Sequence, residues 1–136
     1  MQIIDTNIVA NFLLDGPFGA AARQLYALDP VWHSEPLLMH ELTNVMATAA
    51  RTQGVALEIA QAGMAQAQSM LRDRLHPMAD AEALAAAHAL GISGYDARFI
   101  CLARLHGQRL VTEDTRLRRA APALTQSLEE ALAELA

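Results

Sequence analysis

The chain has 136 residues, of which 53% are apolar, and a formal net charge of −5 at pH 7. This length and composition predict a single domain over residues 1–136 that can bury roughly two thirds of its unfolded surface. The one cysteine, Cys101, excludes an internal disulfide framework and a cysteine-based zinc site, and no apolar run reaches the ~18 residues of a membrane span, so we expect a cytoplasmic protein without membrane association.

The first half of the chain alternates short apolar runs with longer segments of helical periodicity. Gly16-Pro17 and Gly54 interrupt that periodicity and separate helices. In chain order the pattern predicts a strand over 2–5, a helix over 6–14, a helix over 18–28, a strand over 30–33, a helix that starts at 34–36 and continues to about 52, and a helix over about 56–72.

The second half continues the alternation with shorter elements. The pattern predicts a strand at 74–77, a helix over 79–90, a helix over 96–106, a strand over 109–112, a short helix over 114–120, a fifth strand at 123–125 and a closing helix over 128–135. Strands separated by helices imply parallel pairing with right-handed crossovers, so we expect an α/β fold. Ligands of such sheets bind beyond the carboxyl ends of the strands, where Asp5 and Asp114 lie.

Four carboxylates stand where short apolar segments end or where helices start or pack. Asp5 follows the first strand, Asp114 follows the strand over 109–112, and Asp96 belongs to Ser93-Gly-Tyr-Asp. Glu41 lies inside a helix at the edge of its apolar stripe, where an unpaired charge is unfavourable. Acids that converge repel one another unless a cation lies between them. The set therefore indicates a divalent-metal site and phosphate chemistry.

Each acid also has a simpler explanation. Asp5, Asp96 and Asp114 stand where helices begin and can cap free backbone N–H groups, and Ser93 with Asp96 matches a capping box. A structural ion pair with an arginine can account for Glu41. These alternatives stay open for each motif alone, whereas metal coordination accounts for all four positions together.

Other catalytic patterns are missing. His40-Glu-Leu-Thr-Asn44 has asparagine where the zinc-protease motif needs a second histidine, and no Gly-rich phosphate loop or Gly-x-Ser-x-Gly elbow occurs. The other histidines show no ligand spacing, so we expect them at the surface or at helix ends: His33, His76, His88 and His106. The absence of lysine excludes the aspartyl-nucleophile phosphatases and the response-regulator receivers, which both require one.

The four acidic segments together resemble a PIN domain, the fold of metal-dependent ribonucleases that includes the VapC toxins of toxin–antitoxin pairs. The resemblance covers nearly the whole chain and rests on Asp5-Thr-Asn, on Glu41 in His-Glu-Leu-Thr-Asn-Val, on Gly94-Tyr-Asp96-Ala and on Thr112-Glu-Asp114. It implies a three-layer PIN-like fold in which helices flank a central twisted parallel sheet of four to five short strands.

The resemblance also implies the chemistry and the partners. RNA hydrolysis would depend on Mg²⁺ or Mn²⁺ held most strongly by Asp5 and Asp96, with Glu41 and Asp114 completing the catalytic set directly or through water. Thr6, Asn7 and Thr112 are expected to orient these carboxylates. The family implies an antitoxin. We also expect a homodimer, because the segment 12–14, Phe18 and the helix of Met64 and Met70 offer more apolar surface than one small core can bury.

The cationic side chains are all arginines, and six lie in the C-terminal third: Arg98, Arg104, Arg109, Arg116, Arg118 and Arg119. A guanidinium can hold a phosphate at two points, so Arg98, Arg116, Arg118 and Arg119 are candidates for positioning RNA. The net negative charge disfavours a general nucleic-acid binder, and these arginines can instead solvate helix faces. The alternative function is a PIN-like module that binds RNA or protein without cleavage.

Overall fold

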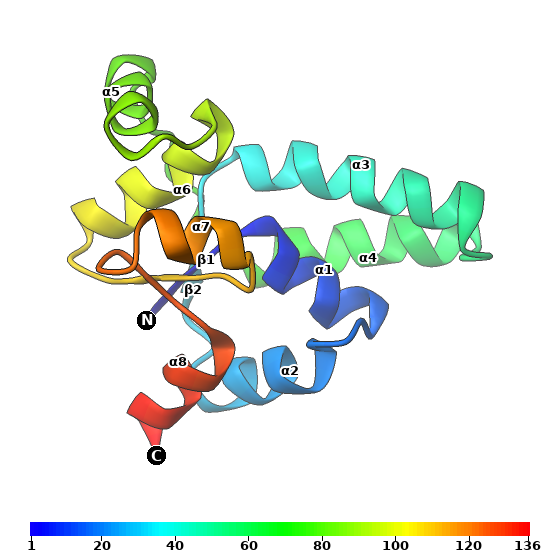
Figure 1. Ribbon diagram of the computed structural model, residues 1–136. Helices are drawn as coiled ribbons and strands as arrows, with labels where there is room; N and C mark the ends of the chain where they lie inside the picture. Colours follow the sequence, from blue (N-terminus) through cyan, green and yellow to red (C-terminus); the bar gives the residue numbers. More distant parts are fainter.

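The computed structural model describes residues 1–136 and has a four-stranded sheet at its centre (Figure 1). The strands follow in the spatial order β2-β1-β3-β4, and every neighbouring pair is parallel. They are short: β1 (Gln2–Ile4), β2 (Trp32–His33), β3 (Leu110–Val111) and β4 (Thr125–Gln126). Helices make the connections that parallel strands require. The predicted α/β fold with a short parallel sheet is confirmed.

Eight helices flank this sheet: α1 (Thr6–Leu14), α2 (Gly19–Leu28), α3 (Leu37–Thr52), α4 (Leu57–Met70), α5 (Asp80–Leu90), α6 (Gly94–Leu105), α7 (Thr115–Ala120) and α8 (Leu128–Leu135). In Figure 1, α3 and α4 lie side by side as a long pair that extends away from the sheet. Helix α5 packs on α6, and α2 packs on α1 and α8. None of the helices has both the length and the apolar character that a membrane span requires.

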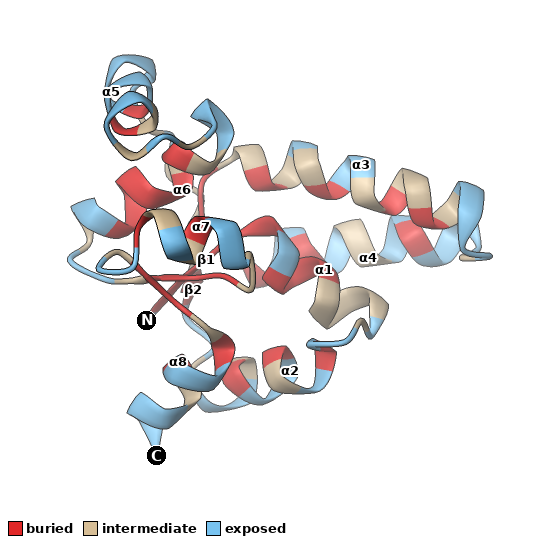
Figure 2. Cartoon of the chain, viewed as in Figure 1, coloured by how far each residue is buried: buried red, intermediate tan, exposed pale blue.

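The core surrounds the two central strands, where Figure 2 shows the buried residues concentrated. Ile3 and Ile4 of β1 exclude all solvent, as do both residues of β3. At the edge of the sheet, Trp32 packs edge-to-face against Phe12 and Tyr26, with ring centroids 6.0 and 5.1 Å away. This aromatic contact fixes α1 and α2 against β2, because such pairs stabilise packing beyond the area they bury.

Most of the apolar side chains for which the sequence predicted a partner pack within the molecule itself. Phe12, with Leu13 and Leu14, packs against the core, as does Met64, and Met70 is buried within it. Phe18 remains 42% exposed. These segments therefore contribute to the core, and among the residues that favoured a dimer only Phe18 stays more than a third exposed.

The segment 74–77 does not form the predicted strand. Its only β-type pairing is an isolated bridge between Ser34 and Leu75. Pro77 has no N–H to extend the ladder, and the Arg74 side chain turns inward to donate to the carbonyl oxygens of Trp32 and Met70. The predicted fifth strand is β4, shifted towards the C-terminus, so the sheet has four strands. Helix α6 begins at Gly94, two residues before the predicted start.

Candidate active site

The four predicted acids line one cleft of about 460 Å³. Asp5 directly follows β1 and Asp114 follows β3, and these two central strands are parallel neighbours, so their carboxyl ends meet at one edge of the sheet. Asp96 lies in the first turn of α6, and Glu41 lies in the second turn of α3. The structure thus brings together residues that are up to 109 positions apart in the chain.

Asp5 is the most enclosed of the four, with 8% of its surface exposed. It caps α1, because its Oδ1 accepts a 3.3 Å hydrogen bond from the N–H of Ile8. Burial raises the pKa of Asp5 from 3.8 to about 7, and the charges of Asp96 and Asp114 add to the rise. The Thr112 hydroxyl and the Ile8 N–H oppose it. The capping hydrogen bond lowers the pKa of Asp5, but it does not offset the larger rise caused by burial of the charge.

Asp96 is half-buried, and only one of the two hydrogen bonds of the predicted capping box is formed. The Ser93 hydroxyl accepts a 3.0 Å hydrogen bond from the Asp96 N–H, but the return bond from the Ser93 N–H to the Asp96 carboxylate is not formed. Burial raises the pKa of Asp96, and the charges of Asp114 and Glu41 raise it further, while a hydrogen bond with Ser93 lowers it. The carboxylate therefore faces other acids across the cleft.

Asp114 caps α7. Its Oδ1 accepts hydrogen bonds from the N–H groups of Arg116 and Leu117, at 2.9 and 3.1 Å. Both bonds use the same oxygen, which leaves Oδ2 for another partner. The Thr112 hydroxyl accepts a 3.1 Å hydrogen bond from the Asp114 N–H and so holds the turn that carries this acid.

Glu41 has no ion-pair partner, so the arginine that could have explained its position is missing. Its Oε1 instead accepts a 2.6 Å hydrogen bond from the Thr6 hydroxyl. Thr6 thus contacts the carboxylate of Glu41, and Thr112 contacts the backbone of Asp114. Asn7 lines the cleft, and its backbone oxygen accepts a hydrogen bond from the Asn11 side chain.

The predicted RNA-contacting arginines differ in their surroundings. Arg116 is exposed and shares a second cavity with Asp96 and Asp114, and Arg119 is exposed on the same helix. Arg98 pairs with Glu35 and Asp80, and Arg118 pairs with Glu113 at 3.2 Å. Two of the four candidates are therefore engaged within the protein.

Sequence reasoning missed three polar side chains that line the cleft: His40, Asn44 and Tyr95. A signal was present for the first two, because they flank Glu41 on α3 and Asn44 lies one turn after it on the same side of the helix. Tyr95 precedes Asp96 and is 63% exposed.

The cleft suits a hard divalent cation. Four of its lining side chains are carboxylates, and no cationic side chain forms an ion pair with any of them. No three carboxylate oxygens lie within 4.8 Å of one another. This open spacing agrees with Mg²⁺, which keeps several of its waters and binds few carboxylates directly.

A short parallel sheet with acids beyond its central strands defines an acidic-cleft α/β domain. The PIN domain family matches residues 3–122, and the chain belongs to this family. Its fold is similar to that of PAE2754 from Pyrobaculum aerophilum, with a TM-score of 0.79, 19% identity, and coverage of 98% of this chain and 93% of that one. A toxin–antitoxin complex from Klebsiella pneumoniae contains a similar chain, with a TM-score of 0.67, 22% identity, and coverage of 93% and 97%. No curated protein sequence matches the chain.

Proposed function

We propose that this protein is a metal-dependent endoribonuclease that hydrolyses RNA phosphodiester bonds and serves as the toxin of a toxin–antitoxin pair. The observation that carries the proposal is a cleft in which Asp5, Glu41, Asp96 and Asp114 face one another without a balancing cation. Such a site is electrostatically unfavourable until a metal ion binds. Membership of a family that typically contains nucleases supports the same chemistry.

The four acids would hold Mg²⁺ or Mn²⁺, and the bound ion supplies an activated water and neutralises charge that develops at phosphorus. The chain's own groups set the geometry. Thr6 holds Glu41, the N–H groups of Arg116 and Leu117 hold one oxygen of Asp114, and burial keeps bulk water away from Asp5.

The exposed groups beside the cleft suit a single-stranded RNA. Arg116 offers a guanidinium next to Asp96 and Asp114, and Arg119 continues the cationic side of α7. Tyr95 offers an exposed ring at the cleft, on which an unpaired base can stack. These arginine and aromatic side chains would bind the RNA and place its phosphodiester backbone beside the four acids.

The antitoxin part of the proposal is supported by the similarity to a chain of the Klebsiella pneumoniae toxin–antitoxin complex.

We also propose a homodimer, for which Leu57, Ile59, Leu84 and Leu105 provide exposed apolar side chains. Light scattering of the purified protein at micromolar concentration tests the dimer. Growth after expression of the chain alone tests the toxin. A monomer contradicts the first part, and unimpaired growth contradicts the second.

Metal-dependent cleavage tests the activity. Wild type should cleave a structured RNA with single-stranded loops in Mg²⁺ and not in EDTA. Asp96→Asn should lose at least ~10²-fold in rate, since the metal supplies several kcal/mol of transition-state stabilisation. The matched control is Asp73→Asn, which removes one exposed charge outside the cleft. Equal rates for the two variants refute the proposal. RNA binding without cleavage by wild type would identify a binding module instead.

A further inference from the structure

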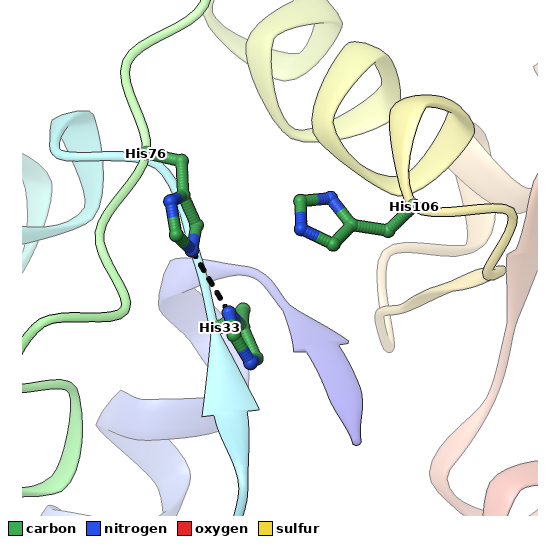
Figure 3. Close-up of side chains that lie close together, drawn as sticks. All are labelled: His33, His76 and His106. Atoms are coloured by element: carbon green, nitrogen blue, oxygen red, sulfur yellow. Dashed lines mark hydrogen bonds between the residues drawn. The ribbon is translucent and has the colours of Figure 1, made fainter.

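Three histidines from distant parts of the chain meet at one place (Figure 3). His33 belongs to β2, His76 lies in the segment between α4 and α5, and His106 is the residue that ends α6. One ring nitrogen of each lies within 4.8 Å of the corresponding nitrogens of the other two. The sequence predicted surface or helix-end positions for these histidines; His106 does end α6 and all three are partly exposed, but the fold also brings them together.

The cluster is separate from the acidic cleft. None of the three histidines lines the cleft. Helix α6 carries Asp96 in its first turn and ends at His106, ten residues later. That separation corresponds to about 15 Å along the helix axis. A ligand of the histidines therefore does not share the site of the four acids.

The rings are arranged so that nitrogens point towards a common space. His33 Nδ1 and His76 Nε2 are 2.9 Å apart, and their rings are stacked with an interplanar angle of 16°. His106 Nδ1 lies 3.1 Å from the carbonyl oxygen of Leu102. A carbonyl can only accept, so this nitrogen carries the proton and Nε2 keeps its lone pair. In Figure 3 the Nε2 edge of His106 faces the other two rings.

We propose that His33, His76 and His106 bind one Zn²⁺ ion, with solvent as the fourth ligand. Three neutral imidazoles suit zinc and the neighbouring late transition metals, whereas Mg²⁺ and Mn²⁺ prefer oxygen. Two nitrogens bound to a tetrahedral Zn²⁺ lie roughly 3.3 Å apart. The distances in the cluster, from 2.9 Å to at most 4.8 Å, bracket this value, so small side-chain rotations complete the site.

The surroundings support this assignment. All three histidines are partly exposed, so an ion and its water can enter. The hydrogen bond from His106 Nδ1 to a carbonyl is the contact that orients metal-binding histidines in known sites. Burial lowers the pKa of His33, and the neighbouring His76, His106, Arg74 and chain amino group lower it further, which favours the neutral ring.

The neighbouring cations are themselves held by other groups. Arg74 donates to the carbonyl oxygens of Trp32 and Met70, and the amino group of Met1 pairs with Asp29 at 2.7 Å. The segment that carries His76 is held to the sheet by one isolated bridge, between Ser34 and Leu75, and by the side-chain contacts of Arg74 with Trp32 and of His76 with His33. Zinc would therefore fasten this segment to β2 and to the end of α6. The site is structural and does not depend on the proposed nuclease activity.

Calorimetric titration of the untagged full chain with Zn²⁺ in excess Mg²⁺ tests the proposal. We expect one zinc per chain, and at a hundredfold excess over the dissociation constant a rise of roughly 5 to 10 °C in melting temperature. His76→Gln and His106→Gln should each weaken binding at least ~10-fold. The matched control His88→Gln removes a histidine of α5 that lies outside the cluster and should bind as wild type does.

Two further measurements separate the cluster from the acidic cleft. Asp5→Asn should keep the zinc affinity, whereas loss of binding in Asp5→Asn but not in His76→Gln would place zinc among the acids and overturn the proposal. Equal affinities of His76→Gln and His88→Gln would overturn it as well. Wild type with Co²⁺ gives a readout that needs no variant: four-coordinate cobalt on histidines has intense visible bands, and weak bands typical of oxygen ligands would contradict the site.

Discussion

The Thr6 hydroxyl donates a 2.6 Å hydrogen bond to Oε1 of Glu41, which joins the first residue of α1 to the second turn of α3. Thr6 is buried and Glu41 is half-buried. A hydroxyl holds the carboxylate in place without neutralising it, unlike an arginine. The bond therefore orients Glu41 and leaves the negative charge of the cleft intact for a metal ion.

Thr6→Val should show whether the Thr6 hydroxyl acts by orienting Glu41 rather than by stabilising the fold. Valine keeps the shape of threonine and loses the hydroxyl, so Glu41 becomes free to rotate. Partners that orient metal ligands are typically worth 10- to 100-fold in metal affinity or activity, and we expect a loss of about 10-fold in cleavage at limiting Mg²⁺. Stability should change by only about 1 kcal/mol. Thr43→Val on the exposed side of α3 is the control, and an equal effect of both substitutions on Mg²⁺ dependence would contradict the role of Thr6.

The metal-free protein should lose stability as pH rises. The pKa of Asp5 is raised by burial to about 7 from 3.8, so between these values the native state holds a proton that the unfolded state has released. The contribution of Asp5 to stability is then highest below pH 4, falls between pH 4 and 7, and is constant above. The loss is on the order of 4 kcal/mol, and Mg²⁺ should restore it at neutral pH. Thermal melts in EDTA and in Mg²⁺ across this range measure both effects.

Asp5→Asn should remove that pH dependence. Asparagine caps a helix about as well as aspartate, so the bond to the Ile8 N–H can be kept while the buried charge disappears. In EDTA at pH 8 the variant should melt higher than wild type, and Mg²⁺ should stabilise it less. Asp73→Asn, which removes an exposed charge, should behave as wild type. A lower melting temperature of Asp5→Asn in EDTA would show that burial of the Asp5 charge is not what limits the stability of the metal-free protein.

Arg116→Gln should weaken RNA binding without unfolding the protein. Its guanidinium is exposed beside Asp96 and Asp114, while its backbone N–H, which caps α7 through Asp114, is unchanged by the substitution. We expect a KM about 5- to 10-fold higher and a salt dependence of log affinity that is shallower by about 0.7, the value for one phosphate contact on a single strand. Arg51→Gln at the far end of α3 is the control. Identical salt slopes for both variants would exclude a phosphate contact at Arg116.

Arg98→Gln should lower stability rather than RNA affinity. Arg98 pairs with Asp80 and with Glu35, which is only 3% exposed, and it also donates to the Met78 carbonyl. Removing the guanidinium leaves a buried carboxylate with only its bonds from the N–H groups of Leu37 and Met78. We expect a loss of about 1 to 3 kcal/mol in urea unfolding. Arg104→Gln, an exposed arginine of the same helix, is the control, and unchanged stability with weaker RNA binding would restore Arg98 to the RNA-contacting set.

Local patterns in the sequence predicted most of the strands and helices and singled out all four acids that line the cleft. The apolar run at 2–4 and the helical spacing after it depend on neighbours within a few residues, and Asp5 and Asp114 follow from where strands end. The strand predicted at 74–77 was wrong, because a local pattern does not supply the hydrogen-bonding partner that a strand needs, and only one bridge formed there.

Contacts between distant segments were decided by the tertiary structure. Glu41 reaches Thr6 across 35 positions, and Arg98 reaches Glu35 across 63, because the crossovers place α1, α3 and α6 around the same strand ends. The same packing brings His33, His76 and His106 together although their spacing in the chain carries no ligand pattern. The sequence by itself determined the elements and the acids beyond the strands. The sheet order β2-β1-β3-β4 decided which side chains meet, because side-chain convergence depends on how strands pair across the whole fold and not on spacing along the chain.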